Sequence, residues 1–183
     1  MEDGLVRINT FHAHRFDPTA AQTEDICVED IAHALSLLCR ANGHLRHFYS
    51  VGQHSLACQR EAAARGWTPR VQLLCLLHDA SEAYIGDLTR PLKRHLPAFD
   101  DIERRLQGQI FAALGVAPPT EAEAAQVAEI DDAMLYWEFQ RLHPTGIECR
   151  CLPLTGPLDL SERAPAAVEA DFLTAYAALK EAL

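Results

Sequence analysis

The sequence predicts an all-α domain, a bundle of about six helices with a minor two-stranded β element. Apolar residues recur at three- and four-residue spacing through most of the chain, and glycine or proline ends the segments that show this spacing. The length of 183 residues, with 49% hydrophobic and 23% charged residues, suits one globular domain. We therefore expect a single domain over residues 1–183, with helices as its main elements.

The expected helices begin at good capping residues and end at residues that break a helix. Asp30 is a favourable N-cap, Gly66 is a natural left-handed terminator, and Pro69 is tolerated in a first turn. The helices are expected from near Asp30 to before Gly43, from about Val51 to Arg65, from Pro69 to Tyr84, from about Phe99 to Leu114, from Glu121 to about Leu142, and from about Ala166 onwards.

The third of these helices is apolar at six of the seven positions 71–77, so it should lie at the centre of the domain. Gly86 breaks the chain after it, and a short turn is expected around residues 89–91.

The β element rests on two short alternating segments. Val6 and Ile8 alternate with polar residues in the segment 5–11, which indicates a short strand. Residues 144–165 are rich in proline and glycine and predict a long loop. Within that loop, residues 147–151 alternate as well, and we expect them to pair with the N-terminal strand.

The net charge of −10 restricts the partners of this chain. Proteins bind long nucleic acids through many contacts between Lys or Arg and phosphates. A protein this acidic is therefore not expected to bind them. Any phosphate it binds should be small and held locally. No apolar run is long enough to span a bilayer, and the first residues lack a signal-peptide pattern, so we expect no membrane contact and a cytoplasmic location.

The central helix turns polar abruptly at His78, Asp79 and Glu82. These side chains can converge at one helix end, since Glu82 is four residues from His78 and three from Asp79. Burying ionised carboxylates there is costly unless a cation compensates. A His-Asp pair on the surface of a helix end is the alternative, and it would be preferred if the pair stood alone.

Other residues point to the same chemistry. His54 lies near the start of the second helix, on a face of apolar and small residues, and His44 and His47 are rivals for its role. Asp131 lies beside the apolar stripe of the fifth helix, with Asp132 as its rival. Two histidines and two aspartates would leave coordination positions open for water and substrate, as in catalytic metal sites. Such ligands suit one divalent ion among Mn, Co, Zn, Ni, Fe and Mg, with Mn or Co preferred.

Two further groups of polar residues accompany this set. Asp87 is followed by the basic residues Arg90, Lys93 and Arg94. His33, Ser36 and Arg40 fall at helical spacing in the first helix and form one polar stripe, which is either a solvated face or a substrate-binding face.

The order His54, His78-Asp79, Asp131 resembles that of the HD-domain metal-dependent phosphohydrolases. The segment HDASEAYIGDLTRPLK closely resembles their bacterial 5′-deoxynucleotidase branch, and the resemblance covers roughly residues 30–140. It implies an HD-domain helical bundle, one metal ion on these four residues, and an assembly of at least two chains.

The resemblance also implies roles for individual residues. Glu82 and Asp87 would move protons around the attacking water and the leaving group, and Arg40 would contact the phosphate. The family's metal-binding aspartate lies seven residues before a glutamate, which selects Asp131 through its distance from Glu138. We include Arg90, Lys93 and His33 among the expected substrate-binding residues.

Two substrate classes remain open. This chain has Arg40-Ala41 where the deoxynucleotidase branch has Arg-Trp, and the stretch from residue 30 to 55 is more similar to HD hydrolases related to phage deoxynucleoside-triphosphate hydrolases. We expect hydrolysis of a 5′-deoxynucleoside monophosphate, with triphosphate release from a deoxynucleoside triphosphate as the alternative. A regulatory module that binds nucleotides without cleaving them, and an HD nuclease, are less consistent with the retained ligands and the acidic charge.

Overall fold

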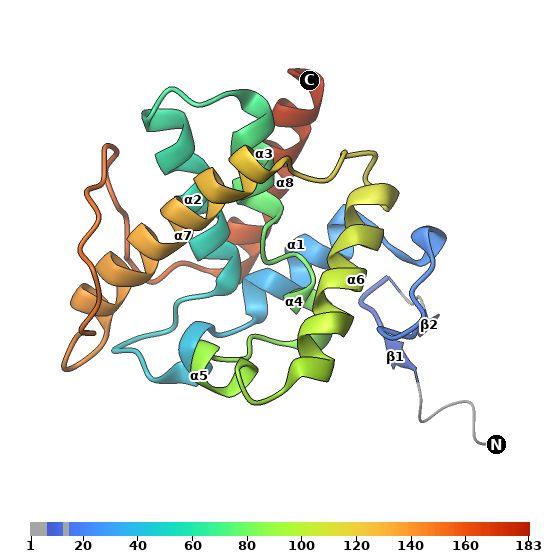
Figure 1. Cartoon of the computed structure of the whole chain (residues 1–183), viewed down its shortest axis with the longest axis horizontal. Coiled ribbons are helices and arrows are strands. Elements are labelled where there is room, and N and C mark those ends of the chain that lie inside the picture. The colour runs from blue at the N-terminus through green and yellow to red at the C-terminus, as the bar shows by residue number, and fades with distance from the viewer. Residues whose placement is uncertain (1–6, 13–14) are drawn as a thin grey trace.

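The computed structural model describes residues 7–12 and 15–183 and is mostly helical, with a small antiparallel sheet (Figure 1). The strands are β1 (Ile8–Asn9) and β2 (Arg15–Phe16). The helices are α1 (Val28–Leu37), α2 (Val51–Ala64), α3 (Pro69–Leu77), α4 (Glu82–Ile85), α5 (Arg90–Lys93), α6 (Pro97–Ala113), α7 (Glu121–Leu142) and α8 (Pro165–Glu181). A 3₁₀ turn covers Thr23–Asp25, and a turn with left-handed residues covers Arg40–Gly43. The predicted fold class, mainly helical with a minor β element, is confirmed.

Helix α3 lies at the centre of the molecule, as its sequence predicts. Its leucines are fully buried, and it packs against α2, α7 and α8 (Figure 1). Since His78 and Asp79 directly follow its last residue, this buried helix places two polar side chains next to the core. None of the described helices has the length and the apolar character needed to cross a lipid bilayer.

Helix α1 differs from its prediction at both ends. It begins at Val28, and Asp30 is a buried residue of its first turn that accepts a hydrogen bond from the His12 backbone N–H. It ends at Leu37, because the chain then becomes extended and Cys39 forms a β-bridge with Ser50. Arg40 therefore lies outside the helix, and the predicted polar stripe does not form.

The segment between α3 and α6 is more finely divided than expected. The predicted helix over 69–84 ends at Leu77, a turn follows, and α4 begins at Glu82. The turn expected around residues 89–91 is the start of the short helix α5. These breaks lie beside the candidate site, and Asp79 and Glu82 on either side of the turn both line one cavity.

The predicted pairing of residues 147–151 with the N-terminal strand is wrong. Strand β1 pairs with β2 instead, in the register Ile8↔Phe16 and Asn9↔Arg15. Leu5 and Val6 of the predicted strand lie outside the described residues. The loop after α7 has its backbone held by side chains, because Gln140 donates to the Ile147 carbonyl and the Glu61 carboxylate accepts from the Thr155 and Gly156 backbone.

Candidate metal centre and pocket

Three helices bring the candidate ligands together. Ser50 caps α2 in a capping box with Gln53, which fixes His54 in the first turn, where its side chain is completely buried. His78 and Asp79 directly follow the last residue of α3. Asp131 projects from the middle of α7, whose start is fixed by another capping box between Thr120 and Glu123. Residues far apart in the sequence thus meet beside the central helix.

The four predicted ligand atoms lie at metal-ligand spacing. His54 Nε2 lies 3.2 Å from both His78 Nε2 and Asp131 Oδ1, and Asp79 Oδ2 lies 3.1 Å from His78 Nε2. The remaining His–Asp separations are 3.6 and 3.9 Å. Ligands about 2.1 Å from one cation are about 3 Å apart when adjacent and about 4.2 Å apart when opposite. The residues present therefore fit a shared divalent ion.

The other ring nitrogen of each histidine already has an acceptor. His54 Nδ1 lies 2.9 Å from a Glu138 carboxylate oxygen, and His78 Nδ1 lies 2.8 Å from the Cys75 carbonyl oxygen. Both acceptors require an N–H, so in the neutral rings the Nε2 atoms carry the lone pairs. Two lone pairs facing each other at 3.2 Å repel unless a proton or a metal ion lies between them. This tautomer arrangement is typical of metal-binding histidines.

The charges at this centre attract each other strongly. Burial opposes charging of the His78 ring, but the neighbouring Asp79 carboxylate outweighs it and raises the pKa of His78 to about 9. Burial likewise opposes ionisation of Asp79, and His78 outweighs it, which lowers the pKa of Asp79 to about 2. The Asp79 carboxylate is therefore ionised across the neutral pH range and can bind a cation.

Glu138 is a functional candidate that our sequence analysis used only to align Asp131. It is buried, and its carboxylate binds Arg40 Nε at 2.8 Å and the Tyr49 hydroxyl at 3.1 Å in addition to His54. Although burial opposes ionisation, His54 and Arg40 lower the pKa of Glu138. Its spacing of seven residues from Asp131, two turns along one helix face, is the signal that could have identified it.

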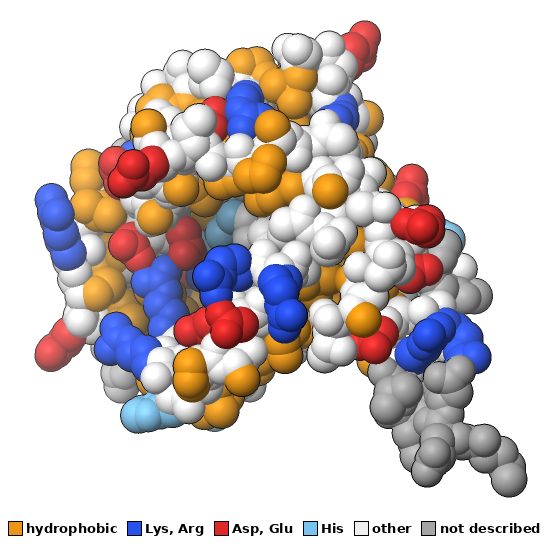
Figure 2. All heavy atoms as spheres, turned by 45° about the vertical axis from the view of Figure 1, so that its right-hand side comes forward, with side chains coloured by type: hydrophobic (Ala, Val, Ile, Leu, Met, Phe, Trp, Pro, Cys, Tyr) orange, Lys and Arg blue, Asp and Glu red, His pale blue; other side chains and the backbone are white. Residues whose placement is uncertain are grey.

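A cavity of about 530 Å³ opens beside these ligands. In Figure 2, histidine atoms lie at the bottom of a hollow whose rim carries both basic and acidic side chains. The lining residues are Arg40, Ala41, His44, Asp79, Glu82, Asp87, Leu88, Thr89, Arg90, Pro91, Lys93, Asp131, Leu135, Phe139, His143 and Ile147. The cavity has the size of a site for a small organic ligand.

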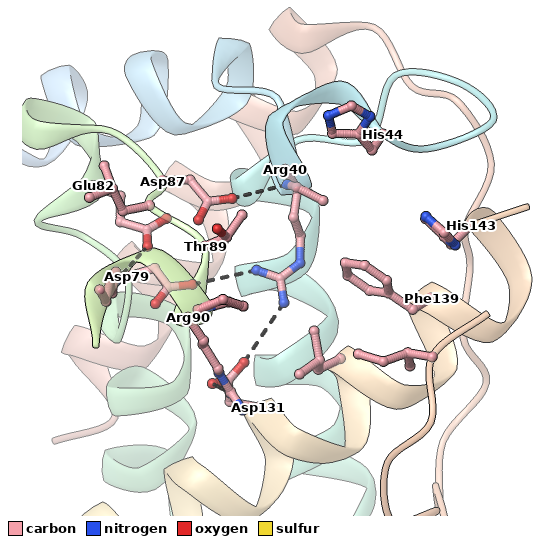
Figure 3. Close-up of a pocket in the computed structure, with 16 residues that line it drawn as sticks. Arg40, His44, Asp79, Glu82, Asp87, Thr89, Arg90, Asp131, Phe139 and His143 are labelled. Atoms are coloured by element: carbon pink, nitrogen blue, oxygen red, sulfur yellow. Dashed lines mark hydrogen bonds and ion pairs between the residues drawn. The ribbon is translucent and has the colours of Figure 1, made fainter. Parts of the chain in front are cut away.

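Both predicted proton-transfer residues face this cavity (Figure 3). Glu82 is 5% exposed, one of its carboxylate oxygens has no hydrogen-bond partner among the described residues, and Lys93 Nζ lies 3.5 Å from the other. Burial, together with the nearby Asp79 and Asp87 carboxylates, raises the pKa of Glu82 to about 9. Asp87 accepts a hydrogen bond from the Ala41 backbone N–H. Glu82 thus has a free oxygen available for a water molecule.

Three of the predicted substrate-binding residues line the cavity, and one does not. Arg40, Arg90 and Lys93 lie at its wall. His33 lies elsewhere, because it faces α8, where it contacts Glu169 at 3.0 Å and stacks on Phe11. The inclusion of His33 in the site is therefore not supported by the structure.

The surroundings of His44, His47 and Asp132 distinguish these rival residues from the four candidate ligands. His47 is held by the Leu160 carbonyl at 2.8 Å, and Asp132 pairs with Arg90 at 2.6 Å. His44 lines the cavity without joining the four ligand atoms. Cys58, which the sequence analysis did not select, has its sulfur 3.6 Å from His54 Nε2 and belongs with His54 and His78 to a group of donors within 4.8 Å of one another.

Comparisons with known proteins identify relatives without a known role. None of the protein-family models searched matches the chain. The chain is 36% identical over 123 residues to the uncharacterized protein YfdR of Escherichia coli, covering 67% of this chain and 66% of YfdR. It is 35% identical over 128 residues to an uncharacterized protein of Rhodobacter capsulatus, covering 65% of this chain and 63% of that protein. The chain thus matches slightly less than two thirds of the length of each of these relatives.

Proposed function

We propose that this protein is a metal-dependent phosphohydrolase of the HD type that acts on nucleotides, with 5′-deoxynucleoside monophosphates as its substrates and phosphate as a product. The observation that carries the proposal is the meeting of His54 and His78 Nε2 with the Asp79 and Asp131 carboxylates. We propose that these four residues hold one divalent ion, with Mn or Co preferred.

The residues around the ligands supply the rest of the chemistry. A bound divalent ion lowers the pKa of water and polarises a phosphate oxygen. Glu82, with its unpartnered oxygen, would orient the attacking water. Lys93 beside it would stabilise the carboxylate form of Glu82, which would accept the proton of that water and become the neutral acid. Asp87 orients or protonates the leaving oxygen. Arg40 directs its guanidinium towards Asp79 and Asp131, where it can also neutralise a phosphate (Figure 3).

The charge of the cavity favours a monophosphate over a triphosphate. Four carboxylates line it, against three cationic side chains. Those three cations are already engaged, since Arg40 pairs with Glu138, Arg90 with Asp131 and Asp132, and Lys93 with Glu103. One divalent ion would bring this lining only to a net charge of about +1, so a substrate with fewer negative charges is better accommodated.

The test is a substrate panel with metal-stripped and metal-loaded protein. After removal of metal with a chelator, Mn or Co is added and the protein is offered deoxynucleoside and nucleoside mono- and triphosphates, with phosphate and triphosphate measured separately. We expect metal-dependent phosphate release from deoxynucleoside monophosphates. Triphosphate release would replace the proposed substrate class by the alternative one. A metal-loaded protein that hydrolyses nothing would contradict the proposal and favour a nucleotide-binding module.

A further inference from the structure

The cavity has two chemically different sides. The metal-ligand side carries carboxylates and cations, whereas the other side carries Leu135, Phe139, His143 and Ile147. Figure 3 shows Asp79 and Glu82 on one side of the Arg40 guanidinium, and Phe139 and His143 on the other. With the proposed divalent ion on the metal-ligand side, a ligand that fills this cavity would combine an anionic end with an apolar end.

The apolar side is built on one face of α7. Leu135 and Phe139 follow Asp131 at intervals of four residues within α7, and His143 is the residue that caps its C-terminal end; all of them line the cavity. Phe139 is eight residues from Asp131, which places it about 12 Å further along the helix axis. A nucleotide can span this separation, because the sugar stands between its phosphate and its base.

The ring of Phe139 is held in a defined orientation. The His143 ring lies nearly parallel to it, with ring centroids 5.7 Å apart and an interplanar angle of 22°. The neighbouring residue Glu138 points into the core, where it binds His54 and Arg40, and this fixes the rotation of the helix. Phe139 is thus set on the cavity wall, and it is not part of the buried core.

We propose that Phe139 is the stacking platform for the nucleobase and that it determines affinity for the base, a role that rests on the proposed function. A flat aromatic ring at the apolar end, facing a phosphate site at the other, matches the chemistry of a nucleoside phosphate. Stacking grows with the area of overlap, so purine substrates are bound more tightly than pyrimidine substrates.

The experiment compares two substrates that differ only by the base. Phosphate release is measured from deoxyadenosine monophosphate and from 2-deoxyribose 5-phosphate, with wild-type protein and with Phe139→Ala. We expect the KM for the nucleotide to rise on the order of tenfold or more, with kcat retained. The KM for the base-free substrate should not change. Phe139→Tyr, which keeps the flat ring, should retain the wild-type KM for both.

The controls separate stacking from folding and from the proposed function. Phe11→Ala removes a phenylalanine that packs on His33 outside the cavity and should leave both substrates unaffected. Phe139→Leu keeps apolar volume without the flat face, and it should raise the nucleotide KM as alanine does. If Phe139→Ala changed the KM of both substrates equally, or left the KM of the nucleotide unchanged, the stacking role of Phe139 would be overturned while the proposed function would stand. Wild-type protein that hydrolyses neither substrate would overturn the proposed function and this inference with it.

Discussion

Asp131 and Asp132 are neighbours in the sequence whose surroundings are opposite. Asp131 Oδ1 lies 3.2 Å from His54 Nε2 and is turned towards the core, whereas Asp132 is exposed and pairs with Arg90. Both carboxylates contact the same arginine, so a substitution at either one disturbs the same surface pair. The two positions therefore form a matched pair for testing the ligand set.

Asp131→Asn should weaken divalent metal binding by more than about 100-fold, since loss of even an outer partner of a metal ligand costs 10- to 100-fold. Asp132→Asn should leave metal affinity within about twofold of wild type, because exposed ion pairs contribute little. Calorimetric titration of Mn into both variants measures the difference. Equal affinities in the two variants would contradict the assignment of Asp131 as a ligand.

Single residues could be predicted from the sequence where their chemistry is unusual for their position. The abrupt polar end of an apolar helix was such a signal and identified His78, Asp79 and Glu82. His33 was assigned wrongly to the site because its spacing to Arg40 assumed that one helix carries both. Glu138 was missed as a site residue, since a glutamate in a helix of mixed polarity is not by itself a sign of burial, and only its spacing from Asp131 pointed to it.

At the scale of elements, the connection between α1 and α2 contains a left-handed turn. Ala41, Asn42 and Gly43 are consecutive residues with positive φ, at 56°, 51° and 78°. This left-handed turn presents the Ala41 backbone N–H to Asp87 and fixes the main chain from which Arg40 reaches the site. Left-handed backbone is costly for residues with a Cβ, so the site is positioned at the expense of local strain.

The same substitution should have opposite effects in this turn and in a regular helix. Gly43→Ala should lower the free energy of unfolding by about 1 kcal/mol, since it adds a Cβ to a left-handed residue. Gly108→Ala should raise it by about 0.5–1 kcal/mol, because this position lies within α6 with open space around it. Denaturant unfolding at equilibrium measures both. A stabilising Gly43→Ala would show that the turn is not left-handed in solution.

The start of α7 predicts a pH dependence. Hydrogen bonds from the Arg70 side chain and from the Thr120 backbone N–H lower the pKa of Glu123 to about 2, and the bond from Arg70 has the larger effect. Because the pKa is lower in the folded state, this contribution is present above about pH 4.5 and is lost as the pH falls towards 2. The difference in melting temperature between wild type and Glu123→Gln should therefore shrink over that range. A difference that stays constant from pH 7 to pH 3 would contradict this pairing.

The sequence predicted the long helices better than their junctions. Helix α7 agrees with its predicted range because Thr120 and Pro144 mark its ends. The third predicted helix was too long, since residues 78–81 have helix-compatible side chains but form a turn in which the Ala80 N–H binds the Leu77 carbonyl. That break depends on tertiary partners such as Gln107, which binds the Leu77 carbonyl and the Ser81 N–H, and no local pattern reveals them.

At the scale of the whole molecule, the candidate site is a product of the packing of α2, α3 and α7 around one point. Its candidate ligands come from positions 54, 78, 79 and 131, and its cavity is completed by Arg40 and Ala41 and by α4 and α5. The order of the motifs predicted four residues that the structure brings together, but the apolar wall of the cavity was not foreseen. Phe139 and His143 line the same cavity as Asp79 and Asp131 only because α7 is packed against the core.

The most direct test of the account is the number of metal ions bound per chain, measured together with activity during stepwise reloading of metal-free protein. Manganese is added in increments, bound metal is determined after equilibrium dialysis, and phosphate release from a deoxynucleoside monophosphate is recorded at each step. We predict that activity is absent without metal and rises in proportion to occupancy up to one ion per chain. Full hydrolytic activity in the metal-free protein, or a protein that binds no divalent ion, would contradict the central claim.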